Sequence, residues 1–532
     1  MKRIWIKNGR VIDGTNTPAH TADVIVEGDR IVSVGEPGSP SDTVIDAAGK
    51  VVCPGFVDIH RHCDAKFLQD SDFGKVMLAQ GITTTVVGNC GMSLTPSPKD
   101  PAEMYDFMEA VLGSGCEKLG LHDYKDYVAA LQSRPLPVNA ASMVGTGSVK
   151  ITVKGFADTP YTAEELKKAA SLIEDALNAG AVGVSCGIMY LPECYSTTNE
   201  FAEILKPLGK AGRVLTAHIR GEGDSLVSSV KEIIEIGKKA GCPVEISHFK
   251  CCGMENWRKG IHEAIALIEE ARAAGQDVTC DFYPYEGGST ALTTMLPPCC
   301  VAGDMTAALA RLGTPEGVEE FRKAAAVRYD DWDNYAITLG WDRILISGVS
   351  APENRRFLGL TVEEAAKKFG FPDSASCAAY LMHTDNGKTA IINMSMCQED
   401  IDTVARLPYS TIISDSIYAD TDTPHPRMYG SFPKIIREYV NERHVLTLEQ
   451  AIEKMTSRPA RRMGLKDRGE LRPGAYADLL IFDPDTFKDR ATFSEPTLLA
   501  EGLSYALLNG VPVWQDGELL SRSAGRCLLA DR

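Results

Sequence analysis

Six side chains that could bind a metal or move a proton stand at the ends of short apolar runs in this chain. They are His60, His62, Cys90, His218, His248 and Asp415. Imidazole and thiolate are the borderline-soft donors that Zn²⁺ prefers, and three protein ligands leave a position for water. Because zinc lowers the pKa of such a water to about 7, this donor set predicts a hydrolytic zinc site.

Asp415 stands in the stretch IISDS, at the end of the last apolar run. A carboxylate there could accept a proton from the water and pass it to a leaving nitrogen. The alternative is a helix N-cap, a common use of aspartate after a strand. The residue type and its position leave both roles open.

The other residues also have structural alternatives. A histidine at a strand end is usually only hydrogen-bonded, and a free cysteine such as Cys90 is more often a small buried hydrophobe than a ligand. The chain has ten histidines, and four of them fall at predicted strand ends beside a cysteine and an aspartate. Chance placement explains this poorly, so we favour the metal site.

A repeated unit, in which a short apolar run precedes a helical pattern, must position these side chains. The runs are VVCPGFVDIH, GITTTVVGNC, PVNAASMVGTG, AGAVGVSCGIMY, RVLTAHIR, PVEISHFK, QDVTCDFYPY and YSTIISDS. Repeated β then α indicates a parallel sheet with helices outside, and eight units are what a closed (β/α)8 barrel needs. The carboxyl ends of barrel strands converge on one face, so side chains far apart in sequence meet there.

The two ends of the chain have a different texture, with short alternating strands and turns. RIWIKNGRVIDG and DVIVEGDRIVSVGE lie near the start, and GAYADLLIFDPD and VPVWQDGELL near the end. This is an antiparallel β pattern, and the termini of compact proteins often lie close together. We predict one small β-sandwich domain built from residues 1–53 and 466–532, with the metal-dependent barrel at 54–465 between them.

A long stretch separates the seventh run from the eighth, beginning near MLPPCC and becoming helical at LTVEEAAKKFG. Long excursions at barrel loops usually cover a site, although a plain insertion is the alternative. We predict an inserted, lid-like segment at about residues 290–370.

Composition argues against several classes of partner. The 532 residues include 55 basic and 72 acidic side chains, for a net charge of −17, which disfavours nucleic acid and anionic membranes.

The start, MKRIWIKNGRVIDG, lacks the apolar stretch of a secretory signal, and no later stretch is long and apolar enough to span a bilayer. The fifteen cysteines do not fit a disulfide framework. We expect a cytoplasmic protein that acts on a small molecule, and a homo-oligomer stays open.

The strand-end residues resemble those of the amidohydrolase superfamily, and more closely its N-acyl-D-amino-acid deacylase (D-aminoacylase) branch. The matching segments are PGFVDIHRHCD, VVGNCG, TAHIRGEGDSL, EISHFK, DFYPYEGGST, TPHPRMYGSFPKIIREYV and GELRPGAYADLLIFDP. Many chemistries share the double-histidine motif, whereas GNCG together with PHPRMYGSFP is far more specific. The resemblance covers nearly the whole chain.

The resemblance implies roles for the metal-binding residues. In that branch a thiolate takes the place of the carboxylated lysine that bridges two metals in hydantoinases and dihydroorotases. Cys90, His218 and His248 would hold a tight zinc, and His60 and His62 would form a weaker second site for a divalent metal that also uses Cys90. Asp415 matches the catalytic aspartate, which acts as general base on the zinc-bound water and then as acid toward the amide nitrogen.

The resemblance also implies a clamp for the carboxylate and neighbouring groups of an N-acyl amino acid. Its members are Lys250, Arg427, Tyr190, Tyr283 and Ser289. Arginine offers a planar fork suited to carboxylate, and lysine a point charge. Without the resemblance, solvated loop charges, packing and turns are the commoner uses of these residues.

Three features bear on the shape of the pocket. Met189 favours an apolar substrate side chain, because the family lines its side-chain pocket at that place. Glu193, in IMYLPECYSTT, stands where a small residue is expected. The stretch from Asp415 to Arg427 is slightly longer than in the best-known members of the branch.

The leading hypothesis is zinc-dependent hydrolysis of N-acyl-D-amino acids to a carboxylate and a free D-amino acid. One alternative is a cyclic amidohydrolase of the hydantoinase or dihydropyrimidinase kind, against which the lack of an evident strand-end lysine counts. The other is a non-catalytic scaffold with the amidohydrolase fold. Scaffolds of that kind tend to lose metal ligands, whereas this chain has the whole set.

Overall fold

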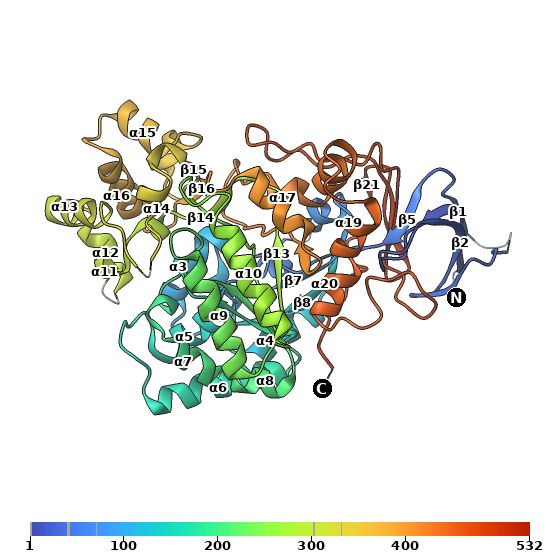
Figure 1. Cartoon of the computed structure of the whole chain (residues 1–532), viewed down its shortest axis with the longest axis horizontal. Helices are drawn as coiled ribbons and strands as arrows, with labels where there is room; N and C mark the ends of the chain where they lie inside the picture. The colour runs from blue at the N-terminus through green and yellow to red at the C-terminus, as the bar shows by residue number, and fades with distance from the viewer. Residues whose placement is uncertain (1–2, 40–42, 71, 302–303, 331, 532) are drawn as a thin grey trace.

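Eight short parallel strands close into a barrel in the computed structural model, which describes residues 3–39, 43–70, 72–301, 304–330 and 332–531 (Figure 1). In order of pairing, the strands are β6 (Phe56–Asp58), β7 (Ile82–Val87), β8 (Asn139–Ser142) continued by β9 (Val144–Gly145), β10 (Gly183–Gly187), β11 (Val214–His218), β12 (Val244–Ile246), β13 (Val278–Phe282) and β17 (Ser410–Ile412). A parallel bridge between Arg61 and Ser416 joins the ends of the last and first strands. Each of the eight predicted runs contains one strand of this barrel.

Helices pack around the barrel and bury the outer faces of its strands. They include α4 (Tyr124–Gln132), α5 (Thr146–Lys154), α6 (Ala163–Asn178), α9 (Leu226–Ala240), α10 (Gly260–Ala273), α17 (Gln398–Arg406) and α19 (Leu448–Met455). Strand β7 is buried along its whole length, as expected for a parallel strand covered on both faces.

Helix α6 shows how local sequence builds this outer layer. The Thr162 hydroxyl accepts a hydrogen bond from the backbone N–H of Glu165, and the Glu165 side chain accepts one from the N–H of Thr162, which together form a capping box. Ala169, Ile173 and Leu177 recur at helical spacing and are buried against the barrel. The charged residues of the helix occupy the opposite face.

Strands from both ends of the chain form a second, nine-stranded sheet. It contains β1 (Arg3–Val11), β2 (His20–Glu27), β3 (Arg30–Val34), β4 (Thr43–Asp46), β5 (Val51–Pro54), β18 (Leu479–Phe482), β19 (Leu503–Leu508), β20 (Val511–Gln515) and β21 (Glu518–Leu519). The two halves join where β5 pairs antiparallel with β18, with Cys53 opposite Leu480. Figure 1 accordingly shows the blue N-terminal strands beside red C-terminal segments.

The segment between β13 and β17 forms a separate lobe. Its three antiparallel strands, in the order β14 (Gly288–Ala291), β16 (Ala390–Asn393) and β15 (Ile344–Gly348), are flanked by helices. The helices are α11 (Pro298–Val301), α12 (Met305–Arg311), α13 (Pro315–Ala324), α14 (Tyr335–Thr338), α15 (Val362–Phe369) and α16 (Ser374–Thr384). The lobe has its own apolar core, which also contains Met189 and Cys252 from loops at the barrel mouth.

Among the described residues, no helix is both long enough and apolar enough to cross a membrane.

Candidate active site

The six predicted metal-site residues lie at or just beyond the carboxyl ends of barrel strands. His218 ends β11, His60 and His62 follow β6, Cys90 follows β7, His248 follows β12 and Asp415 follows β17. Three of these residues have a positive φ: 52° at Cys90, 36° at His248 and 49° at Asp415. This backbone conformation is energetically unfavourable for residues other than glycine. Its occurrence at three of the six residues therefore indicates a site under functional constraint.

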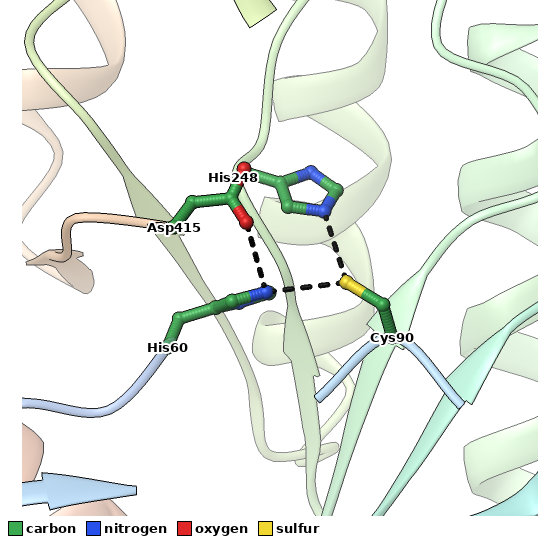
Figure 2. A group of neighbouring side chains, drawn as sticks. All are labelled: His60, Cys90, His248 and Asp415. Atoms are coloured by element: carbon green, nitrogen blue, oxygen red, sulfur yellow. Dashed lines mark hydrogen bonds and ion pairs between the residues drawn. The ribbon is translucent and has the colours of Figure 1, made fainter. Parts of the chain in front are cut away.

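Four of the side chains form a tight cluster (Figure 2). His60 Nε2 lies 3.2 Å from Cys90 Sγ and 3.3 Å from Asp415 Oδ1. Cys90 Sγ lies 3.5 Å from His248 Nε2. The ligand atoms of all four residues fall within 4.8 Å of one another, which is the spacing a single metal ion needs.

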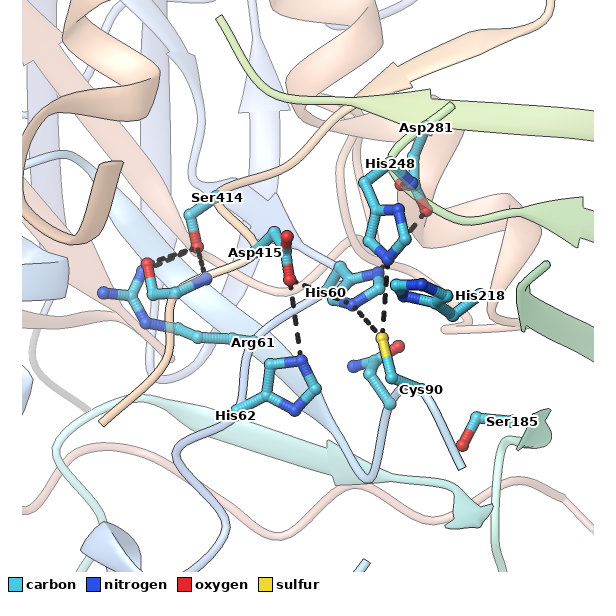
Figure 3. A network of polar contacts seen from close by, with 12 residues as sticks. His60, Arg61, His62, Cys90, Ser185, His218, His248, Asp281, Ser414 and Asp415 are labelled. Atoms are coloured by element: carbon cyan, nitrogen blue, oxygen red, sulfur yellow. Dashed lines mark hydrogen bonds and ion pairs between the residues drawn. The ribbon is translucent and has the colours of Figure 1, made fainter. Parts of the chain in front are cut away.

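The remaining two histidines border this cluster (Figure 3). The His218 ring lies 4.5 Å from the His248 ring between centroids, and His218 Nε2 is 3.2 Å from Met189 Sδ. His62 Nε2 is 3.5 Å from Asp415 Oδ1. The structure therefore brings together all six residues that the sequence predicts.

The chemistry of the donor set fits a soft divalent cation. Burial lowers the pKa of His60 to about 3 and that of His218 well below its usual value, so the imidazoles are neutral and can offer lone pairs. Burial raises the pKa of the Cys90 thiol, so its thiolate needs a neighbouring cation. The Nδ1 atoms of His60, His62 and His218 are buried and find no hydrogen-bond partner among the residues that the structure describes.

Asp415 is held as a carboxylate. Burial opposes its ionisation, but the charge of the Arg427 guanidinium outweighs that effect and holds the pKa of Asp415 well below its usual value. Arg427 Nη1 lies 2.7 Å from Asp415 Oδ2. The backbone N–H of Asp415 donates to the carbonyl of His60 at 2.9 Å, which ties the last strand to the first.

Arg61, between the two histidines, has a structural role. Its buried guanidinium lies 3.2 Å from Asp58 Oδ2 and donates to Tyr418 Oη at 2.9 Å and to Ser414 Oγ at 3.2 Å. Figure 3 shows Arg61 beside Ser414. These contacts join the segment after β6 to the segment after β17. They fix the backbone on which His60, His62 and Asp415 stand.

The predicted substrate residues line the same cavity as the metal-site residues. Its lining includes Lys250, Arg427, Tyr190, Tyr283 and Ser289 together with the metal-site residues other than His60. Arg427 stacks 4.7 Å over the Tyr283 ring and donates to the Ser289 carbonyl at 3.2 Å. Tyr190 Oη lies 3.4 Å from Thr290 Oγ1.

Two acidic residues of the site were not singled out from the sequence. Asp281, in β13, accepts a hydrogen bond from the backbone N–H of His248, and its Oδ2 lies 3.9 Å from His60 Nδ1 (Figure 3). Glu222, four residues after His218, lies 2.5 Å from Lys250 Nζ. A strand-end aspartate is a signal that could have revealed Asp281, whereas the contact of Glu222 depends on how its loop folds.

Glu193, which departs from the expected small residue, is buried beneath the Cys90 turn. It accepts a hydrogen bond from the Gly187 backbone N–H at 3.0 Å and another from the Thr146 hydroxyl. A Cβ added at Gly91 would meet Glu193 Oε2 at 1.9 Å. Glu193 therefore supports the turn that carries Cys90 and does not line the cavity.

The fold and this cluster define a class of (β/α)8-barrel proteins that carry a candidate metal centre at the carboxyl ends of their strands. A family model described as the amidohydrolase family matches residues 43–279 and 401–514. The chain belongs to the amidohydrolase family and groups there with D-aminoacylase.

Three relatives illustrate this relationship. D-aminoacylase from Alcaligenes xylosoxydans xylosoxydans is 33% identical over 99% of this chain and 97% of its own. A solved N-acyl-D-glutamate deacylase from Bordetella bronchiseptica, with zinc and a phosphonate mimic of the tetrahedral intermediate, is 32% identical over 100% of both chains, with a TM-score of 0.84. A structure addressing the binuclear metal centre of D-aminoacylase is 34% identical over 99% of both chains, with a TM-score of 0.83. The predicted fold class and family are confirmed.

Proposed function

We propose that this chain is a zinc-dependent hydrolase that cleaves the amide bond of N-acyl-D-amino acids, giving a carboxylate and a free D-amino acid. The observation that carries the proposal is the convergence in one cavity of Cys90, His218, His248 and Asp415 with the cations Lys250 and Arg427. Metal donors, a proton-transfer group and a carboxylate clamp are the three parts that this reaction needs. The relatives named above support the same chemistry.

Cys90, His218 and His248 are the residues that would hold the tight zinc, and His60 and His62 would add a weaker second site that shares Cys90. Zinc, when bound, supplies a Lewis acid that polarises the amide carbonyl and lowers the pKa of a water molecule. The thiol and four buried imidazoles supply soft donors for the two sites.

Asp415 is the proton-transfer group in this proposal. Its carboxylate takes a proton from the attacking water and delivers it to the amide nitrogen as the carbon–nitrogen bond breaks. The ion pair with Arg427 at 2.7 Å and the backbone tie to His60 fix its direction. Asp415 thus acts first as a base and then as an acid.

The substrate carboxylate is the proposed partner of Arg427, Lys250, Tyr283, Tyr190 and Ser289. Arg427 and Lys250 supply opposite-charge donors in a buried setting, where such hydrogen bonds are strong. The Tyr283 hydroxyl is buried and has no partner among the described residues, so it is free to donate to a substrate oxygen.

The substrate side chain is the finer part of the proposal. A second cavity shares Met92, Val111, Met189, Tyr190 and Thr290 with the first. Its lining continues over Phe107, Leu191, Ala291, Thr293, Thr294, Leu296, Pro298, Met305 and Trp332, and no charged residue of the described chain is among them. An acidic side chain would be buried there unpaired, at a cost of several kcal/mol or more, so we propose an apolar D side chain.

A substrate panel tests the proposal. Zinc-loaded protein is assayed with the N-acetyl derivatives of D- and L-leucine, D-methionine and D-glutamate, and with a 5-substituted hydantoin. We expect N-acetyl-D-leucine to be hydrolysed at least about 100-fold faster in kcat/KM than its enantiomer. Preference for the L form, hydrolysis of the hydantoin alone, or no hydrolysis of any member would refute the activity. Preference for D-glutamate would refute only the apolar pocket.

A further inference from the structure

Glu222 lies in the loop between β11 and α9, with only 5% of its surface exposed. Its carboxylate faces three residues of the site. Oε1 lies 2.5 Å from Lys250 Nζ and 3.0 Å from His248 Nδ1, and Oε2 lies 4.0 Å from His218 Nε2. One buried carboxylate therefore contacts a proposed zinc ligand and a proposed substrate-binding cation through the same oxygen.

The backbone around Glu222 is fixed from two sides. Asp333, from the lobe between β13 and β17, accepts hydrogen bonds from the backbone N–H groups of Glu222 and Gly223, each at 2.6 Å, and of Ser225 at 3.0 Å. The N–H of Cys252 donates to the Glu222 carbonyl at 2.6 Å, which ties the loop to the segment after Lys250. The direction of the carboxylate is thus set by the fold and not by a mobile surface loop.

The two ring nitrogens of His248 have different partners. Nε2 points toward Cys90 Sγ at 3.5 Å, and Nδ1 points toward Glu222 and Lys250. Nε2 can offer its lone pair to a cation only if the ring hydrogen resides on Nδ1, and a carboxylate that accepts this hydrogen stabilises that tautomer. Lys250 Nζ lies 2.7 Å from Nδ1, nearer than Glu222 Oε1 at 3.0 Å, so the ammonium and the carboxylate compete for this nitrogen, and the ammonium alone would favour the opposite tautomer.

We propose that Glu222 is a positioning residue that couples the metal centre to the substrate clamp: it competes with Lys250 for Nδ1 of His248 in favour of the metal-binding tautomer, and it holds the Lys250 ammonium in a direct ion pair. This rests on the proposed roles of His248 and Lys250. Loss of Glu222 should therefore weaken zinc binding and substrate binding together.

The first test compares Glu222→Gln with Glu232→Gln. Glu232 lies on the neighbouring helix α9, pairs with Arg220 at 2.8 Å and belongs to no part of the proposed machinery. Zinc affinity is measured by competition with a chromophoric chelator, and kinetics with N-acetyl-D-leucine at saturating zinc. We expect Glu222→Gln to weaken zinc binding by about 10- to 100-fold and to raise KM by a larger factor than it lowers kcat. Glu232→Gln should stay within twofold of the parent in both.

A second comparison separates two effects of Glu222: control of the His248 tautomer and neutralisation of the Lys250 ammonium. In the background of Lys250→Met no ammonium can reach Nδ1, so we expect Glu222→Gln still to weaken zinc binding about tenfold or more relative to Lys250→Met alone. Equal zinc affinity of these two variants, or a zinc affinity of single Glu222→Gln within twofold of the parent, would overturn the inference. Thermal unfolding of the metal-free variants identifies loss of fold. A parent protein that binds no zinc would instead refute the proposed function.

Discussion

At the scale of single residues, the site is built on backbone conformations that its side chains do not favour. Cys90, His248 and Asp415 all have left-handed φ values, which cost of order 1–3 kcal/mol each. The surrounding contacts hold them there: the His248 N–H donates to Asp281, and the Asp415 N–H donates to the His60 carbonyl. In these conformations, the three side chains, each of which follows a different strand, are directed toward the same cluster.

Asp415→Asn tests the proton-transfer role. The amide keeps the size of the carboxylate but cannot accept and return a proton, so we expect kcat to fall by about 10²- to 10⁴-fold. Zinc content should stay near that of the parent, because Asp415 is not proposed as a tight ligand. Kinetics and elemental analysis of the same sample check both points, and near-normal turnover would exclude the role.

At the residue scale, the sequence predicts the candidate metal ligands but not the residues that contact and orient them. His60, His62, Cys90, His218, His248 and Asp415 were predicted from type and position at strand ends, and the structure places them together. Glu222 was not predicted, because its partners Lys250 and Asp333 lie 28 and 111 residues away in sequence. Nothing in a linear pattern indicates which loop turns a carboxylate inward.

At the scale of elements, the turn after β7 determines the placement of Cys90. Gly91 has a φ of +74°, and its Cα lies so close to Glu193 and to the backbone of Gly187 that no side chain fits. Glu193 fills the space beneath the turn and accepts the Gly187 N–H. This explains in physical terms why a large acidic residue is tolerated where a small one was expected.

Gly91→Ala tests the role of this turn, with Gly212→Ala as its control. Both glycines have positive φ, +74° and +63°, but a Cβ at Gly212 meets nothing within 4 Å. We expect Gly91→Ala to lower the free energy of unfolding by about 1–3 kcal/mol more than Gly212→Ala, because overpacking adds to backbone strain. Chemical denaturation measures the difference, and equal effects would show that the turn can relax.

The eight barrel strands were predictable because each is an apolar run followed by a helical pattern. The lobe between β13 and β17 was predicted only as an inserted, lid-like segment. Its strands β14 and β16 pair across about a hundred residues, from Ser289 to Ile392, and short strands joined over such a distance leave little periodic signal.

At the scale of the whole molecule, the sheet formed by the chain ends is fastened to the barrel by a buried polar network. Asp478, just before β18, accepts hydrogen bonds from Arg468, from Asn139 Nδ2 of strand β8 at 3.2 Å and from the backbone N–H of Asn509 at 2.7 Å. The network joins residues 370 apart in sequence, since Asn509 also donates to Asn139.

Asp478→Ala tests this connection. It leaves the buried Arg468 guanidinium without its carboxylate, so we expect the free energy of unfolding to fall by about 3–5 kcal/mol. The zinc affinity of the folded variant should be unchanged, because no proposed ligand contacts the network. Chemical denaturation measures the free energy of unfolding, and chelator competition measures the zinc affinity. A decrease in the free energy of unfolding of less than about 1 kcal/mol would mean that the network does not hold the sheet to the barrel.

A zinc titration of the metal-free protein, assayed with N-acetyl-D-leucine, tests the central claim most directly. We expect no measurable hydrolysis without metal, a rise in rate that is complete at the first equivalent of zinc, and no comparable rise with N-acetyl-L-leucine. The Cys90→Ala variant should remain inactive over the same range, because it lacks the proposed thiolate ligand. Full activity without metal, or equal rates with the two enantiomers, would contradict the account.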